Sequence, residues 1–198
     1  RFYIEKPWSI EKCNKHSIFL SQGNYPLKGF HQVLKAVSLI KDDFPKLKIY
    51  FAGRDILMKE KKLINLIKQK NVIYLGTLNE SEMIREYKKS NIFICPSSIE
   101  NSPNSLAEAQ ILGVPCIASN VGGIPDMINH TQSGLLYRFE EIEQLAEYIK
   151  YLFNNHIHAA ELGSNGRKSA ILRHDKLNIV KQLISIYKKI EINSPLKE

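Results

Sequence analysis

Residues 92–125 read IFICPSSIENSPNSLAEAQILGVPCIASNVGGIP, and the rest of the chain is organised around them. The stretch opens with a short apolar run, Ile92 to Cys95, which a proline and two serines end, as is typical of a strand that leads into a functional loop. A short helix is predicted to start near Ser102 or Ser105 and to stop at Gly113, with Pro103 at or beside its first turn. The pattern therefore predicts strand, polar loop and helix.

Two carboxylates, Glu100 and Glu108, flank the start of this helix, with seven residues between them. A helix N-terminus carries free backbone N–H groups and the positive end of the dipole, so it can hold a phosphate while the two acids hold hydroxyl groups. For Glu108 an alternative stays open: Ser105-x-x-Glu108 is also a capping box, in which the glutamate caps its own helix. Glu100 has no helix to cap, which favours ligand binding.

The stretch resembles the donor-binding signature of retaining glycosyltransferases with the GT-B fold, of the family-4 or "group 1" type. Their motif is a glutamate, seven residues and a second glutamate. The resemblance extends beyond the two glutamates, over Cys95–Ser98, Leu106–Ala109, Gly113–Ala118 and Gly122–Pro125. The whole string in this order is specific, whereas two carboxylates at this separation are common by chance.

The resemblance implies roles for individual residues. Glu108 would hold the ribose hydroxyls of a sugar nucleotide, and Glu100 would contact the transferred sugar as a catalytic residue. The backbone near the sugar and phosphate would come from the loop and the helix start, at Asn101, Ser102, Asn104, Ser105 and Leu106. The family reaction retains anomeric configuration, and the donor would be a UDP- or GDP-type sugar nucleotide.

A second loop, residues 23–29, follows the predicted strand Ser17–Gln22 and leads into a helix. A glycine-bearing loop between a parallel strand and a helix is typical of phosphate binding. The resemblance assigns the donor diphosphate to Lys28, as a second catalytic residue, beside Gly23, Asn24 and Gly29; the alternative is a surface lysine at a helix start. Asn24 stands where the family most often has an arginine, so one phosphate partner is missing.

Further strands are predicted at 47–53, 72–76, 114–119 and 134–137, alternating with helices, which favours parallel pairing with right-handed crossovers. The resemblance places Gly76, Thr77 and Leu78, after the third strand, near the nucleobase. The remaining predictions are a basic helix at 56–70, a helix capped by Asn79 or Ser81, a short helix that starts at Ile124-Pro125-Asp126, a helix near 142–152, a segment interrupted by Gly163 and Gly166, and a last helix at about 175–190.

The composition of the 198 residues is that of an ordinary globular protein, with 43% hydrophobic and 24% charged residues. The net charge of +8 favours anionic partners, of which nucleotide diphosphates and acidic lipid surfaces fit best. No aromatic-basic stripe indicates nucleic acid. Three cysteines, an odd number, suggest free thiols in a reduced, cytoplasmic compartment. No metal-ligand spacing and no Asp-x-Asp occurs, so we expect no metal and no cofactor.

We therefore expect an α/β fold: a Rossmann-like doubly wound parallel sheet of about six strands with helices on both faces. Residues 1–198 would form a single nucleotide-sugar-binding domain, the C-terminal half of a GT-B fold, with the N-terminal acceptor domain absent. The whole protein would transfer sugar to a glycan, lipid or other acceptor, in the cytoplasm or peripherally at the inner face of the membrane. Two alternatives remain: a non-catalytic nucleotide- or partner-binding domain, and a sugar-nucleotide epimerase.

Overall fold

The computed structural model describes residues 2–3, 6–22, 26–53 and 71–193. Their strands form one six-stranded sheet in the order β3-β2-β1-β4-β5-β6, in which every neighbouring pair is parallel. The doubly wound parallel sheet predicted from the sequence is thereby confirmed. The strands are β1 (Ser17–Gln22), β2 (Lys48–Gly53), β3 (Val72–Tyr74), β4 (Ile92–Cys95), β5 (Cys116–Ser119) and β6 (Leu135–Tyr137).

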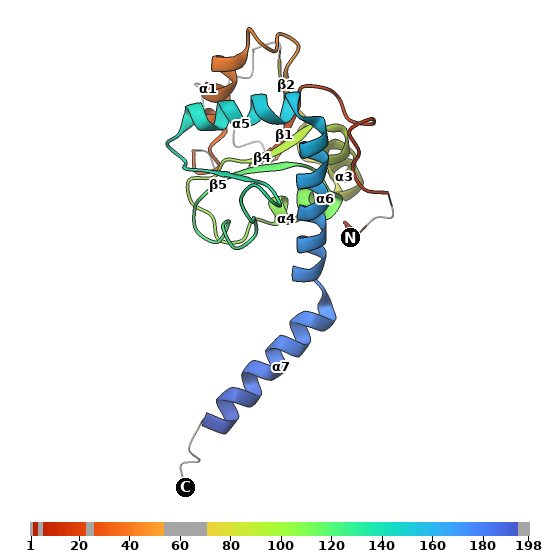
Figure 1. Cartoon of the computed structure of the whole chain (residues 1–198), viewed down its shortest axis with the longest axis vertical. Helices are drawn as coiled ribbons and strands as arrows, with labels where there is room; N and C mark the ends of the chain where they lie inside the picture. The colour runs from red at the N-terminus through yellow and green to blue at the C-terminus, as the bar shows by residue number, and fades with distance from the viewer. Residues whose placement is uncertain (1, 4–5, 23–25, 54–70, 194–198) are drawn as a thin grey trace.

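Helices cover both faces of the sheet, because its strands are apolar on both sides (Figure 1). Successive side chains of a strand point to opposite faces. In β1, Ile18 and Leu20 pack with α1 (Phe30–Ile40) and α5 (Ile142–Asn154), whereas Phe19 packs with α3 (Glu80–Lys89) and α4 (Asn104–Leu112). Burial on both faces explains why the central strands read as continuous apolar runs.

The last two helices are α6 (His156–Arg173) and α7 (Lys176–Asn193). The predicted interruption at Gly163 and Gly166 is wrong, since α6 runs through both. A Cβ atom at Gly163 would lie 2.2 Å from the carbonyl oxygen of Gly113, and one at Gly166 would lie 2.9 Å from that of Ser133. These glycines allow α6 to approach the end of α4 and the loop before β6 closely.

Three further predictions concern helices. The short helix predicted to start at 124–126 is wrong, since these residues form a bend and a turn. The carbonyl of Met127 accepts hydrogen bonds from the side chains of Gln110 (2.8 Å) and Arg173 (3.2 Å), which hold it out of a helical ladder. The helix predicted at 56–70 lies outside the described residues, while Asn79 caps α3 as predicted, through a full capping box with Glu82.

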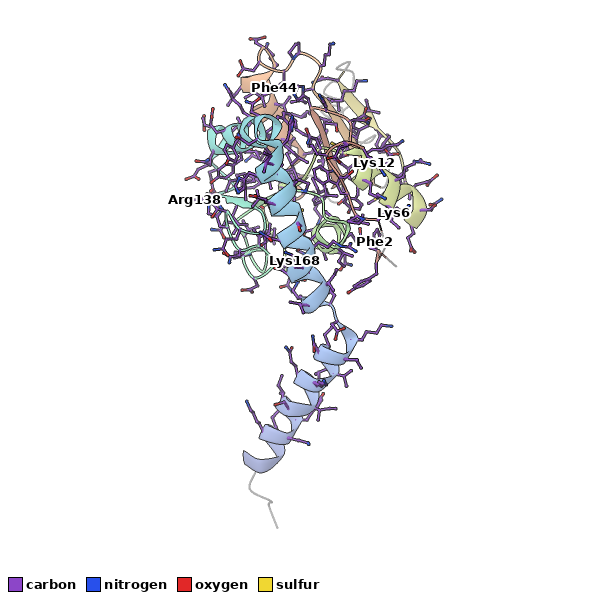
Figure 2. All side chains as sticks on the ribbon, turned by 45° about the vertical axis from the view of Figure 1, so that its right-hand side comes forward. Phe2, Lys6, Lys12, Phe44, Arg138 and Lys168 are labelled. Atoms are coloured by element: carbon purple, nitrogen blue, oxygen red, sulfur yellow. The ribbon has the colours of Figure 1, made fainter. Side chains whose placement is uncertain are left out.

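Helix α7 extends away from the body of the molecule (Figure 1). Figure 2 shows its side chains projecting on all sides without a neighbouring layer. Its apolar side chains are exposed, Leu177 at 70% and Tyr187 at 66% for example. Among the described helices, none combines the length and apolar character needed to cross a membrane.

The strand order reverses direction between β1 and β4. The chain leaves β1 towards α1 on one face and leaves β4 towards α4 on the other face. In open α/β sheets a crevice forms at this switch point, beyond the carboxyl ends of the strands. Both loops singled out in the sequence follow these two strands.

Candidate functional site

The loop that precedes α1 lies directly against the loop that follows β4. The backbone N–H of Ser98 donates to the carbonyl of Leu27 at 2.8 Å. Gly29 adopts φ +67° at the start of α1, and a Cβ atom there would lie 1.7 Å from the carbonyl oxygen of Pro96. Only glycine fits this approach, and it places the adjacent Lys28 over the end of β4.

Lys28 and Glu100, 72 positions apart in the chain, form an ion pair at this crossing. The Ser97 hydroxyl also donates to the same carboxylate oxygen, Oε2 of Glu100, at 3.3 Å. The side chains keep 32% and 15% of their surface exposed, so both remain partly accessible from solvent. The structure thus brings together the two residues predicted to be catalytic.

Neighbouring elements hold the Glu100 loop from behind. The hydroxyl of Ser119, at the end of β5, donates to the carbonyl of Ser97 at 2.5 Å. Cβ atoms at Gly122 and Gly123 would lie 1.7 and 2.1 Å from the carbonyl oxygens of Glu100 and Asn101. Sequence patterns alone do not place Ser97, Ser119 or the two glycines at the site, although a Gly-Gly pair is a signal of close backbone contact.

Helix α4 begins within this loop with no side-chain cap, Pro103 being its N-cap residue. Its first turn is closed by the N–H of Leu106, which donates to the Pro103 carbonyl at 3.1 Å, so the N–H groups of Asn104 and Ser105 precede this bond. The side chain of Leu106 is fully buried, which leaves only its backbone near the helix start. The side chains of Asn101, Ser102 and Asn104 are exposed around it.

Glu108 does not complete a capping box with Ser105, because the N-cap residue of α4 is Pro103 and Ser105 lies inside the helix. It accepts a hydrogen bond at Oε2 from the hydroxyl of Tyr87, on α3, at 3.0 Å. Burial raises the pKa of the Glu108 carboxyl above its ordinary value, the bond from Tyr87 lowers it, and the charge of Glu80 raises it. The sequence does not predict this contact, since Tyr87 and Glu108 lie on different helices.

Gly76, Thr77 and Leu78 follow β3 at the same edge of the sheet and lead into α3. Gly76 adopts φ +74°, and its carbonyl accepts from the N–H of Gly53 at 3.0 Å. Thr77 is exposed, and Leu78 packs against the core on the side of α3 and α4. Two other predicted site residues, Gly23 and Asn24, lie outside the described residues.

The described site combines a cation, two carboxylates and an uncapped helix start along the carboxyl edge of a parallel sheet. Such an arrangement can bind an anionic group at Lys28 and at the N–H groups of α4. The carboxylates can accept hydrogen bonds from hydroxyl groups on either side of that anion. A ligand that carries both phosphate and hydroxyl groups fits this chemistry.

Comparison with known proteins gives a match of residues 4–169 to the family model "Glycosyl transferases group 1". The capsular polysaccharide biosynthesis glycosyltransferase CapM of Staphylococcus aureus is 28% identical over 174 residues, covering 86% of this chain and 44% of CapM. The chain spans about half the length of the curated relatives it matches, 51%, 44% and 46% for three of them.

Solved structures share the fold. HepE from Anabaena, in complex with UDP-glucose, has a TM-score of 0.78 at 21% identity, covering 89% of this chain and 49% of HepE. The C-terminal domain of the group 1 glycosyl transferase LpcC from Francisella tularensis has a TM-score of 0.70 at 20% identity, covering 84% of this chain and 89% of that domain.

Proposed function

The chain belongs to the glycosyl transferases group 1 family, and we propose that it is the donor-binding, C-terminal half of a retaining, family-4 glycosyltransferase with the GT-B fold. The donor would be a UDP- or GDP-type sugar nucleotide, and the product a polysaccharide or other glycoconjugate. Two relatives support this proposal: HepE carries UDP-glucose on the same fold, and CapM belongs to capsular polysaccharide synthesis.

The observation that carries the proposal is the meeting of Lys28 and Glu100 at the switch point, beside the uncapped start of α4. We assign the donor diphosphate to Lys28 and to the N–H groups of Asn104 and Ser105. Glu108 then takes the ribose hydroxyls, and Glu100 takes the transferred sugar.

These residues would act by electrostatic stabilisation. Negative charge grows on the leaving diphosphate while the sugar becomes oxocarbenium-like, so a fixed cation and a helix N-terminus stabilise the transition state more than the ground state. In the retaining reaction we propose that the acceptor attacks on the face from which the diphosphate leaves. No metal or other cofactor enters this scheme.

The acceptor would be bound mainly by an N-terminal domain that this chain does not contain. We place the whole protein in the cytoplasm, with contact to the inner face of the membrane if the acceptor is a lipid. On this proposal the isolated chain binds the donor nucleotide weakly and transfers no sugar by itself.

The test is calorimetric binding of UDP, GDP, uridine and guanosine to the chain and to Lys28→Ala. Loss of a contact to the charged diphosphate should weaken the preferred diphosphate by about 1.5–3 kcal/mol and its nucleoside hardly at all. Added salt should reduce the difference in diphosphate affinity between the unmutated chain and Lys28→Ala, because the site is open to water.

Lys35→Ala is the matched control, since Lys35 is an exposed lysine of α1 that no predicted site includes. It removes the same charge and should leave diphosphate affinity within about twofold of the original. Equal losses for diphosphate and nucleoside in Lys28→Ala, or no binding of either diphosphate to the unmutated chain, would refute the proposed function.

A further inference from the structure

The Glu108 carboxylate is held by a residue from a neighbouring helix. Tyr87 on α3 is fully buried, and its hydroxyl lies 3.0 Å from Oε2 of Glu108 and 3.0 Å from the carbonyl oxygen of Ser105. We propose that Tyr87 is the positioning residue of the ribose-binding carboxylate: its hydroxyl orients Glu108 for the sugar hydroxyls of the nucleotide. This inference rests on the proposed function and adds a residue to it.

The tyrosine ring has one orientation because aromatic rings surround it. Phe19 packs edge-on at a centroid distance of 5.0 Å, Phe93 lies at 5.3 Å, and Phe2 packs edge-on at 6.4 Å. Each such pair favours its own geometry. Phe19 of β1 and Phe93 of β4 therefore fix the position at which the Tyr87 hydroxyl contacts α4.

The hydroxyl contacts both parts of α4 that the proposed function uses. One contact is the Ser105 carbonyl in the first turn, and the other is the carboxylate one turn further on. A buried tyrosine needs a partner for its hydroxyl, and the charged acceptor gives the stronger bond. Tyr87 thereby sets the carboxylate relative to the helix start that would hold the phosphate.

The bond leaves room for a ligand on Glu108. A carboxylate offers about four acceptor positions on two oxygens, and Tyr87 occupies one of them. In the described part of the chain no other hydrogen bond reaches this carboxylate. The remaining positions suit a pair of adjacent hydroxyl groups, as on a ribose.

Charge supports the same role. Burial raises the pKa of Glu108 and the bond from Tyr87 lowers it, so the bond favours the ionised form of the buried carboxylate. Of the other groups near this pair, Glu80 raises the pKa of Glu108. The pKa of Tyr87 is raised first by burial, then by Glu108, and less by Cys116 and Cys95. Burial raises the pKa of Tyr87 well above its ordinary value, so its hydroxyl keeps its proton and donates.

The experiment compares UDP and GDP with their 2′,3′-dideoxy forms, which lack the ribose hydroxyls, on the unmutated chain and on Tyr87→Phe. The variant keeps the packed ring and removes only the hydroxyl. We expect it to weaken the preferred diphosphate about tenfold and the dideoxy form less than about twofold. The acid limb of diphosphate binding should move to higher pH, because Glu108 loses the bond that lowers its pKa.

Tyr137→Phe is the matched control. Tyr137 is also buried, but its hydroxyl has no hydrogen-bond partner among the described residues, and its ring packs on the opposite face of the sheet. Loss of that hydroxyl should change neither affinity nor the pH profile.

Two further measurements sharpen the test. In a Glu108→Gln background, Tyr87→Phe should add no loss beyond about twofold, because both changes act through one carboxylate. In the unmutated chain, the Cζ resonance of Tyr87 should move when the preferred diphosphate binds and stay in place with the dideoxy form.

The role of Tyr87 is overturned if Tyr87→Phe loses no affinity, or loses equal affinity for the diphosphate and its dideoxy form. It is also overturned if the losses in Tyr87→Phe and Glu108→Gln are fully additive, or if the Cζ resonance does not move. If Glu108→Gln weakens the diphosphate while Tyr87→Phe does not, only this inference fails. If Glu108→Gln itself leaves the affinity unchanged, the ribose assignment within the proposed function fails as well.

Discussion

Glu108 is an unfavourable residue for the stability of the folded chain. Because burial raises the pKa of its carboxyl, the folded chain binds a proton there more tightly than the unfolded chain does. Above the folded pKa the ionised carboxylate therefore reduces the free energy of unfolding, and this cost disappears as the pH falls through that pKa. A residue that costs stability at a site is consistent with a role in binding.

We therefore expect Glu108→Gln to separate stability from binding. Near neutral pH the melting temperature should stay equal or rise, since the buried charge is removed, while affinity for the preferred nucleoside diphosphate falls. Below about pH 4 the stability gain should vanish, because the pH then lies below the pKa of Glu108 in both the folded and the unfolded chain. Glu147→Gln, at an exposed position on α5, controls for loss of a carboxylate. A melting temperature several degrees lower with unchanged binding would indicate a purely structural role.

Glu100→Gln should affect binding differently from Glu108→Gln, because the Glu100 carboxylate pairs with Lys28 and lies near the proposed diphosphate position. Glu100→Gln removes a charge that competes for Lys28 and repels phosphate, so UDP should bind at least as tightly as before. The preference for UDP-glucose over UDP should fall, since the contact to the sugar is weakened. Calorimetry with both ligands measures this, and a loss of UDP affinity as large as that in Lys28→Ala would contradict it.

At the contact between helices α4 and α6, two opposing effects determine how a substitution of glycine changes stability. Helix propensity favours alanine over glycine inside a helix by about 0.5–1 kcal/mol. At Gly163, however, a Cβ atom would lie 2.2 Å from the backbone oxygen of Gly113, a contact that requires the helices to separate. Overpacking of this kind costs about 1–3 kcal/mol, so the contact should outweigh the propensity.

Gly163→Ala should accordingly lower the melting temperature, by about 2–4 °C for each kcal/mol lost. Gly166→Ala, in the same helix, is the matched comparison, since its Cβ atom would meet the oxygen of Ser133 at 2.9 Å, a milder approach. Its effect should be clearly smaller. Thermal unfolding of the two variants and the unmutated chain measures both effects. A Gly163→Ala variant more stable than the unmutated chain would show that helix propensity outweighs the steric contact.

These glycines also show where sequence patterns stop being informative. Apolar periodicity and turn residues predicted the parallel sheet, α4 with its end at Gly113, and the Asn79 cap, because each depends on neighbours in the chain. Gly163 and Gly166 were interpreted as breaks, because sequence shows low helix propensity but not which backbone lies opposite. The turn at 124–126 was missed for the same reason, since distant side chains hold Met127.

For the candidate site, too, sequence predicts individual residues but not their long-range contacts. A resemblance in motif proposed Lys28, Glu100 and Glu108 one by one, and the structure places them along one edge of the sheet. Their partners could not be predicted: the ion pair of Lys28 with Glu100 joins residues 72 apart, and the Tyr87 bond to Glu108 joins residues 21 apart. Contacts of this kind depend on strand order, which local patterns do not contain.

For the molecule as a whole, strand order explains why the site lies at this edge. The chain builds β1, β2 and β3 outward in one direction and then returns to place β4 beside β1. The loops that follow β1 and β4 are therefore neighbours although β4 comes much later in the chain. Their contact needs Gly29, whose missing side chain lets the first loop lie on Pro96.

Helix α7 stands apart from this arrangement. It makes few contacts with the body, and its large apolar side chains from Leu177 to Ile190 are exposed. Burial of apolar surface is the main source of stability in a folded domain, at about 25 cal/mol for each Å². A helix that buries almost none should contribute little to the stability of the sheet and its covering helices.

Removal of the segment after His174 should thus leave the melting temperature of the remaining domain within about 2 °C of the original. The far-ultraviolet helix signal should fall by less than α7 would contribute if fully formed, because most helical stability in proteins comes from packing of an apolar face, and that face of α7 is exposed. Amide exchange on the intact chain provides an independent check: amides of α7 should exchange far faster than those of α4, whose side chains are mostly buried. A drop of several degrees on truncation, or slow exchange throughout α7, would show that α7 is stabilised by packing that its exposed side chains do not explain.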